Sequence, residues 1–318
     1  MSLSTPVALL IFNRPSLTKV VFGEISKVKP KKLLVIADGP RAGIPGEEEK
    51  CATARAIVDE VDWDCQVLRN YSDMNLGCGL RPATGITWVF EHVEKAIILE
   101  DDCVPHTTFF RFCSELLEKY RNDERVMMIT GTNVLGKWKS DVQSYHFSNY
   151  GGALGWASWR RAWKFFDYDM ELWKYEEVRK RIRDVLADEE QFKYRADIFD
   201  MTYRKKGVTW WDYQWGFARL LQSGLSIVPS LNLVSNIGFT KEATHTVNPL
   251  DCFANLPWYQ MPFPLRDPPG VTPDREYDRQ FFLRASGRLQ NRAPNIAGRA
   301  SNRIRNLLRS HGHIQSRA

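Results

Sequence analysis

The chain has 318 residues, of which 43% are hydrophobic and 12% aromatic, a composition typical of an ordered globular protein rather than a disordered one. No apolar run approaches the roughly 18 residues that a membrane-spanning helix needs, and the N-terminus lacks the basic segment of a secretion signal. The six cysteines show no CxxC spacing, so neither a zinc site nor a disulfide framework is indicated. These features predict a soluble, cytoplasmic protein.

The formal charge of +6 is unevenly distributed. Residues 279–318 contain nine arginines and no acidic residue, so residues 1–278 carry a charge of −3. An arginine-rich end of this kind binds anionic lipid, nucleic acid or an acidic partner, or it is simply solvated and partly disordered. The composition leaves both interpretations open.

Apolar runs and helical patterns alternate four times within the first hundred residues. The predicted strands are residues 6–12, 31–37, 65–70 and 96–99. A helix is predicted after each of the first three, beginning with one from Ser16 as its N-cap. This alternation predicts an α/β fold with a mostly parallel central sheet flanked by helices, in which ligands bind beyond the carboxyl ends of the strands.

The second half of the chain continues with a helix and a strand and then becomes rich in aromatic residues. From about residue 251 it is rich in proline, asparagine and arginine, which predicts that the compact fold ends near residue 260. The expected organisation is one domain at 1–260, with halves at 1–104 and 105–260, and a C-terminal extension at 261–318.

Polar residues follow the predicted strands at the point where each strand ends. They are Asn13, Arg14, Asp38, Asn70, Asp73, Glu100, Asp101 and Asp102. Because the carboxyl ends of parallel strands meet at one edge of a sheet, we expect these side chains to converge on a ligand site.

Glu100, Asp101 and Asp102 form the densest acidic cluster, and no basic residue stands beside them in the sequence. Adjacent carboxylates cost stability unless a cation or a donor-rich ligand relieves their repulsion. A hard cation such as Mg²⁺ or Mn²⁺ suits these oxygen ligands and would also neutralise a diphosphate. The alternative is that the three acids merely cap the following helix.

Two common phosphate-binding motifs are missing from the sequence. No GxxxxGK[ST] loop is present, which argues against a P-loop NTPase, and no GxGxxG follows the first strand, which argues against a dinucleotide dehydrogenase. A nucleotide-sugar transferase and a metal-dependent phosphodiesterase or nuclease remain.

Several motifs resemble the bacterial relatives of glycosyltransferase family 2, which have a GT-A fold. They are LLIFNRP, VIADGP, NLGCG, AIILEDDCVP, GWASWRRAW and NIGFTKEATHT, and they span roughly residues 6–250. The first half is also distantly similar to N-acetylglucosaminyltransferase I, which has a like Asn-Arg pair and a Glu-Asp-Asp metal motif. The resemblance implies an inverting, metal-dependent hexosyl- or N-acetylhexosaminyl-transferase of polysaccharide biosynthesis. The implied donor is a nucleotide diphosphate sugar, with a UDP-sugar favoured, and the implied acceptor is a glycan, a lipid-linked sugar or a small molecule.

The resemblance implies a donor site in residues 1–104. Asn13 and Arg14 would belong to it, with Arg14 near the nucleotide phosphates, and Asp38 would bind the base. Arginine suits bidentate phosphate contacts, and a carboxylate can accept a base N–H. The alternatives are an ordinary surface arginine and a plain Asp-Gly turn residue.

The resemblance also implies that Asp102 and His245 hold Mn²⁺ or Mg²⁺, while Glu100 and Asp101 support the ribose or the sugar. His245 belongs to a late THT motif, where many GT-A enzymes place a metal-binding histidine, and Asn236 would shape the same loop. Taken alone, a single histidine is more often a surface or satisfied residue. A metal-independent enzyme is also conceivable.

A catalytic base is expected in residues 105–260, because the acceptor hydroxyl must lose its proton. We select Asp212, which opens a predicted helix among aromatic residues, with a simple N-cap as the alternative role. Trp156, which follows Gly155, is expected at the site, and Trp159 in the core.

Two further functions stay open: a metal-dependent phosphodiesterase or nuclease, and a non-catalytic carbohydrate-binding protein on a GT-A scaffold. We favour the transferase, so no nucleic acid is expected as a partner. Ile304, Leu307 and Leu308 fall on one helical face among arginines, which indicates peripheral contact with the inner face of the membrane.

Overall fold

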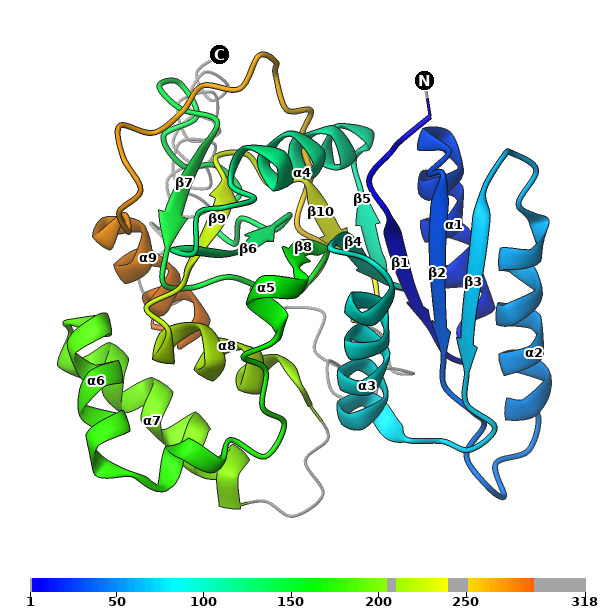
Figure 1. Cartoon of the computed structure of the whole chain (residues 1–318), viewed down its shortest axis with the longest axis horizontal. Coiled ribbons are helices and arrows are strands. Elements are labelled where there is room, and N and C mark those ends of the chain that lie inside the picture. The colour runs from blue at the N-terminus through cyan, green and yellow to red at the C-terminus, as the bar shows by residue number, and fades with distance from the viewer. Residues whose placement is uncertain (1, 205–209, 240–250, 289–318) are drawn as a thin grey trace, which may run out of the picture.

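The computed structural model describes residues 2–204, 210–239 and 251–288 (Figure 1). An eight-stranded sheet forms its centre, and a two-stranded sheet lies beside it. The strands are β1 (Val7–Ile11), β2 (Lys32–Ala37), β3 (Gln66–Tyr71), β4 (Lys95–Glu100), β5 (Cys103–Pro105), β6 (Val126–Thr130), β7 (Tyr145–Ser148), β8 (Trp156–Trp159), β9 (Leu225–Pro229) and β10 (Val234–Asn236). The predicted α/β class is confirmed.

The strand order of the large sheet is β3-β2-β1-β4-β8-β6-β9-β7. β1 pairs in parallel with both β2 and β4, whereas β8 and β7 run antiparallel to their neighbours. The chain therefore moves outward from β1 to β3 and then returns to place β4 on the other side of β1. Such a reversal leaves a crevice beyond the carboxyl ends of the two strands, here between β1 and β4.

Helices cover both faces of the sheet. α1 (Pro15–Val28), α2 (Glu47–Ile57) and α4 (Thr107–Lys119) pack on one face, and α3 (Gly77–His92), α5 (Arg160–Trp163) and α8 (Asp212–Leu221) pack on the other. α6 (Glu176–Leu186), α7 (Glu189–Arg204) and α9 (Arg275–Ala285) form a third core with α8. In Figure 1, α6 and α7 lie together below α8, far from β1–β3.

The strands near the crevice are buried on both sides because helices lie over each face. All five residues of β1 are buried, which explains its unbroken apolar sequence. α1 begins one residue before the expected Ser16, because Pro15 supplies the fixed φ angle that suits a first helical position. Arg14 thus becomes the N-cap residue of α1.

Two antiparallel strands, β7 and β8, were not predicted from the sequence. Both are buried and only four residues long, which is too short for a period to identify them as strands. β8 pairs with β4 and β6 and carries the aromatic GWASWRRAW segment into the centre of the sheet. The two halves of the chain therefore share one sheet.

The expected end of the fold near residue 260 is not what the structure shows. Beyond that residue, Met261 is buried in the main core, and α9 inserts Tyr277, Phe281 and Phe282 into the interior. Proline and arginine were enriched here because the segment crosses the surface between these anchors. Residues 289–318, including most of the arginine-rich end, lie outside the described residues. Among the described residues, no helix is long and apolar enough to cross a membrane.

Candidate functional site

A cavity of about 1570 Å³ opens at the crevice between β1 and β4 and extends under α7, α8 and α9. Seven residues selected from the sequence line it: Asn13, Arg14, Asp38, Glu100, Asp101, Asp102 and Asp212. The convergence arises because parallel strands place their carboxyl ends at one edge, while α8 approaches from the second half of the chain.

Arg14 supplies the positive charge that the acidic cluster lacks in the sequence. Its guanidinium forms a two-point ion pair with Asp101, and its Nη1 atom lies 3.0 Å from Oδ2 of Asp102. Burial opposes the charge of Arg14, but the two carboxylates outweigh it and raise the pKa of the guanidinium. The residue after β1 therefore neutralises part of the charge after β4.

One guanidinium does not offset three carboxylates. Burial and the charges of Asp102 and Asp101 raise the pKa of Glu100 to about 8. Burial also raises the pKa of Asp101 to about 6, although Arg14 acts in the opposite direction. The cluster keeps a surplus of negative charge, which is the electrostatic property of a site that receives a cation.

Glu100 and Asp212 lie on the same side of the sheet. Alternation along β4 places Ala96, Ile98 and then Glu100 on the face covered by α3 and α8. Asp212 is the first residue of α8, with Trp211 at the N-cap position, and its charge contributes to the raised pKa of Glu100. A carboxylate from the second half of the chain thus faces the acidic cluster, and the N-cap alternative for Asp212 does not apply.

The short sheet of β5 and β10 builds the wall beside Asp102. Asn236 pairs with Cys103 in this sheet and donates a hydrogen bond from Nδ2 to Oδ1 of Asp102 at 3.1 Å. A Cβ atom on Gly238 would stand only 2.0 Å from Oδ2 of the same carboxylate, so glycine is required there. Asn236 therefore holds the carboxylate of Asp102, whereas the His245 loop that it was expected to shape lies outside the described residues. His245 lies outside the described residues, and its metal role stays a prediction.

The donor set fits a metal ion only in part. Within residues 2–204, 210–239 and 251–288, no group of three or more His, Cys, Asp or Glu side chains is arranged to hold one. Mg²⁺ is often held by one or two carboxylates together with substrate phosphates, rather than by a complete protein cage. The charge surplus around Asp102 fits that mode, in which the metal binds with a diphosphate.

Asp38 has a structural role that the sequence did not favour. Its Oδ1 accepts hydrogen bonds from the backbone N–H groups of Gly39 and Leu76, and its Oδ2 accepts from Gly77 N and Asn75 Nδ2, all at 2.9–3.1 Å. A carboxylate offers about four acceptor positions, so the set is complete. In this structure Asp38 fixes the loop before α3, and no acceptor position is left for a nucleotide base.

Asn13 is held in place by a second buried carboxylate. Its Nδ2 donates to Oε1 of Glu47 at 2.8 Å, and Glu47 also pairs with Arg41. Hydrogen bonds from Arg41 lower the pKa of Glu47 to about 2. Asn13 is thus oriented at the cavity wall by the first turn of α2.

Trp156 lies in the core and not at the site, so the sequence-based expectation for it was wrong. It is fully buried on β8 and packs against Trp211 and Trp215, with ring centroids 5.6 and 6.1 Å apart. Those two tryptophans line the cavity instead. Trp159 is buried, as predicted.

Two other strand-end residues are not among those that line the cavity. Asn70 accepts a hydrogen bond from the buried Arg81 at 2.7 Å, which ties β3 to α3. Asp73 belongs to the turn whose backbone packs tightly against Gly39.

The cavity residues that sequence reasoning missed include Arg195 on α7 and Arg219 on α8. Arg219 follows Asp212 by seven residues, which is nearly two helical turns. That spacing places the two residues on one face of the helix and was the available signal.

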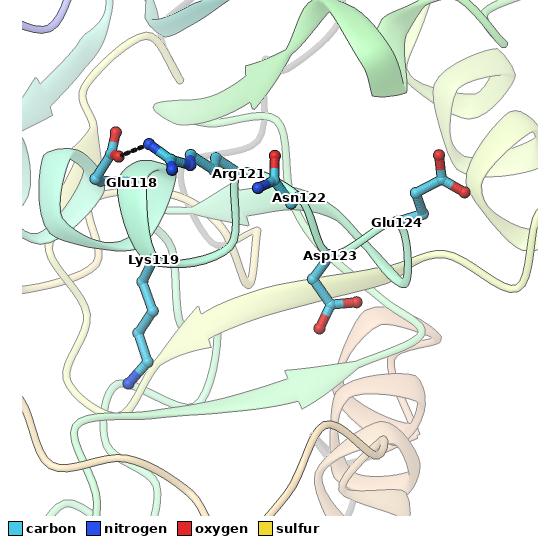
Figure 2. A pocket seen from close by; sticks show the side chains of 6 residues that line it. All are labelled: Glu118, Lys119, Arg121, Asn122, Asp123 and Glu124. Carbon is cyan, nitrogen blue, oxygen red and sulfur yellow. Dashed lines mark hydrogen bonds and ion pairs between the residues drawn. The ribbon is translucent and has the colours of Figure 1, made fainter.

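A second hollow, of about 670 Å³, lies at the end of α4 (Figure 2). Its lining is charged and polar: Glu118, Lys119, Arg121, Asn122, Asp123 and Glu124. Several of these side chains already form ion pairs, for example Glu118 with Lys95 and Arg121. Because this loop leads into the start of β6, it lies at the sheet edge opposite the crevice. It is not part of the candidate site.

Comparisons with known proteins give distant structural likeness only. No family model matches the chain, and no curated protein matches its sequence. Among solved structures, S. aureus TarS 1-349 has a TM-score of 0.41 and 10% identity, covering 73% of this chain and 59% of that one. The apo form of mouse xyloside xylosyltransferase 1 has a TM-score of 0.36 and 12% identity, covering 70% of this chain and 85% of that one. At these scores neither an activity nor a substrate is transferred to this chain.

Proposed function

We propose that this protein is a glycosyltransferase that takes its sugar from a nucleotide diphosphate sugar. The observation that carries the proposal is the meeting of Arg14, the Glu100–Asp102 cluster and Asp212 in one large cavity at the crevice of the sheet. The sequence resemblance to GT-A enzymes supports the same reading. Hexosyl or N-acetylhexosaminyl specificity and an inverting outcome are parts of the proposal that rest on the resemblance.

The surplus of negative charge on the carboxylates explains how the proposed donor site would bind a metal ion together with a diphosphate. A diphosphate carries negative charge, so it approaches these carboxylates only when a cation accompanies it. Asp102 would hold Mn²⁺ or Mg²⁺, with His245 as the expected second ligand. A metal bound there would stabilise the negative charge of the diphosphate leaving group.

In this proposal Asp212 acts as the general base. Its position at the first turn of α8 stabilises a negative charge, because backbone N–H groups point toward that end of a helix. In the proposed reaction Asp212 accepts the proton of the acceptor hydroxyl. The hydroxyl oxygen bonds to the anomeric carbon of the donor sugar while the sugar–phosphate bond breaks. Trp211 and Trp215 are buried in the wall beside it and shape that part of the cavity.

The first experiment separates donor binding from transfer. The melting temperature of the full chain would be measured with a panel of nucleotide sugars, each with Mn²⁺, with Mg²⁺ and with EDTA. We expect one nucleotide sugar, with a UDP-sugar favoured, to raise the melting temperature only when metal is present. Asp102→Asn should abolish this shift. Asp212→Asn should keep the shift and lose slow donor hydrolysis and transfer.

Two outcomes would count against the proposal. If no nucleotide sugar changes the melting temperature while metal with DNA or RNA does, the phosphodiesterase interpretation replaces it. If Asp102→Asn and Asp212→Asn both keep full biological function, the protein is a carbohydrate-binding scaffold. Lys95→Gln, which removes a surface ion pair with Glu118 outside the cavity, is the matched control and should behave as wild type.

The proposal also includes a lipid-linked acceptor and a location of the protein at the membrane. A lipid-linked acceptor would be met at the inner face of the cytoplasmic membrane, where the arginine-rich residues 289–318 would bind anionic lipid. Vesicle binding of the full chain and of a chain ending at Arg288 tests this, because the shorter chain keeps α9. Equal binding to anionic vesicles would contradict the membrane role.

A further inference from the structure

Two guanidinium groups in the inner part of the cavity have no carboxylate partner. Arg219 is 3% exposed, and Arg195 is half-buried on the facing helix α7. In the described part of the chain, neither forms an ion pair, whereas Arg179 and Arg279 bind Asp200 and Asp188. An unpaired buried cation is costly, so the position of Arg219 near the charge of Arg195 needs an explanation.

The contacts of Arg219 leave most of its hydrogen-bonding capacity unused. Its Nη1 donates to Oγ of Ser226 at 2.6 Å, and its buried Nε has no hydrogen-bond partner among the described residues. Burial, and then the charge of Arg195, lower the pKa of Arg219 to about 9. The guanidinium is therefore held in an environment that lacks a counter-charge.

Arg195 also lacks an acidic partner among the described residues. Its guanidinium lies over the ring of Tyr150, 4.7 Å from the centroid, and its buried Nε is also without a hydrogen-bond partner in the described residues. Asp278 is the acid that acts on Arg219, but its carboxylate already accepts hydrogen bonds from Ser148 and Asn149 at 2.5 and 2.9 Å. The protein itself thus leaves the charge of the two arginines largely uncompensated.

The backbone is shaped to keep Arg219 in place. A Cβ atom on Gly151 would stand 2.4 Å from Oγ of Ser226, so only glycine leaves room for the hydroxyl that binds Arg219. Gly151 and Gly152 also line the cavity at this point. Small residues here leave space beside the guanidinium groups for a ligand.

We propose that Arg195 and Arg219 form an anion-binding subsite that holds a phosphate or carboxylate group of the acceptor. Asp212 and Arg219 share one face of α8, and seven residues of helix separate them by about 10 Å. An acceptor hydroxyl at Asp212 and an anionic group at Arg219 can therefore belong to one molecule. Assigning the anion to the acceptor rests on the proposed transferase function, and the existence of the subsite does not.

The test uses the full chain and simple anions at constant ionic strength. Inorganic phosphate and D-glucuronate would replace chloride, and binding would be followed by the melting temperature and by calorimetry. We expect phosphate, glucuronate or both to bind. Arg195→Gln should weaken that binding by about tenfold or more, the usual effect of losing a charge-assisted hydrogen bond. If neither anion binds, the subsite does not exist.

Arg219→Met distinguishes a ligand site from a structural arginine. We expect it to lose anion binding while its melting temperature without anions rises, because an uncompensated buried cation is removed. A lower melting temperature with anion binding intact would overturn the proposal. Arg204→Gln is the matched control, since Arg204 also lines the cavity but already pairs with Asp200 at 3.5 Å.

A final experiment tests whether the two arginines bind the acceptor or the donor. Phosphate or glucuronate binding would be repeated with saturating UDP and Mn²⁺. Simultaneous binding supports an acceptor subsite, whereas displacement by UDP would place the two arginines in the donor site and overturn the assignment. If UDP-sugars and UDP do not bind at all while the anions still do, the transferase function fails and the subsite stands.

Discussion

Nη1 of Arg14 lies 3.0 Å from Oδ2 of Asp102, so a residue after β1 neutralises a residue after β4, 88 positions later in the chain. The same guanidinium binds Asp101. The contact exists because β1 and β4 are parallel neighbours whose carboxyl ends meet at one edge.

Replacing Arg14 with methionine should destabilise the protein strongly. The buried carboxylates of Asp101 and Asp102 would lose their cationic partner, and removing one member of a buried ion pair typically costs about 3–5 kcal/mol. Urea unfolding at neutral pH measures this change. Arg125→Met, which breaks the exposed pair with Asp123, should cost less than about 1 kcal/mol. Similar small effects for both variants would show that Arg14 does not hold the cluster together.

The role of Asp38 can be separated from donor recognition. Asp38→Ala would leave the N–H groups of Leu76 and Gly77 without their acceptor, at about 1–3 kcal/mol for each buried group. We expect a lower free energy of unfolding in urea even without a nucleotide sugar. A variant of normal stability with weaker donor binding would restore the base-binding role inferred from the sequence.

His146 should make the protein sensitive to acid. It is buried against Tyr277, and neither ring nitrogen has a hydrogen-bond partner among the described residues. Burial lowers its pKa to about 3 from an ordinary value of 6.5, with Asp274 and Lys139 acting in opposite directions. The unfolded chain therefore binds one more proton between these values, and stability falls as the pH decreases through that window.

The His146 effect is measured by comparing the wild type with His146→Phe, which keeps a buried ring. The wild type should lose up to about 1.4 kcal/mol more than the variant for each pH unit below 6.5. Urea unfolding at pH 7, 6 and 5 gives the two slopes. Parallel slopes would mean that His146 is protonated in the fold.

The fold should require α9 but not the sequence after it. A chain that ends at Val271 loses the buried side chains of Tyr277, Phe281 and Phe282, each worth about 1.5–3 kcal/mol. That sum approaches the whole stability of a typical domain, so we expect this chain to be unfolded by circular dichroism. A chain that ends at Arg288 should melt as the full chain does. A folded chain ending at Val271 would restore the domain end near residue 260.

Several features of the site followed from the sequence by itself. Two apolar runs of the sequence, one followed by Arg14 and the other by Glu100–Asp102, identify two strands and the polar residues after them. This works because apolar periodicity and turn residues are patterns that extend over only a few positions. Alternating strands and helices then require a mostly parallel sheet, and a parallel sheet gathers those ends. Asp212 at the start of a helix was likewise a local signal.

Only the tertiary structure decided how these residues are used. Whether Asp38 faces a ligand or the N–H groups before α3 depends on a loop that packs against it from elsewhere in the chain. Trp156 is a core residue because β8 inserts between β4 and β6, and Arg195 meets Arg219 because α7 packs on α8. Contacts between segments far apart in sequence depend on the burial and packing of the whole chain. Residue patterns within one segment therefore do not predict them.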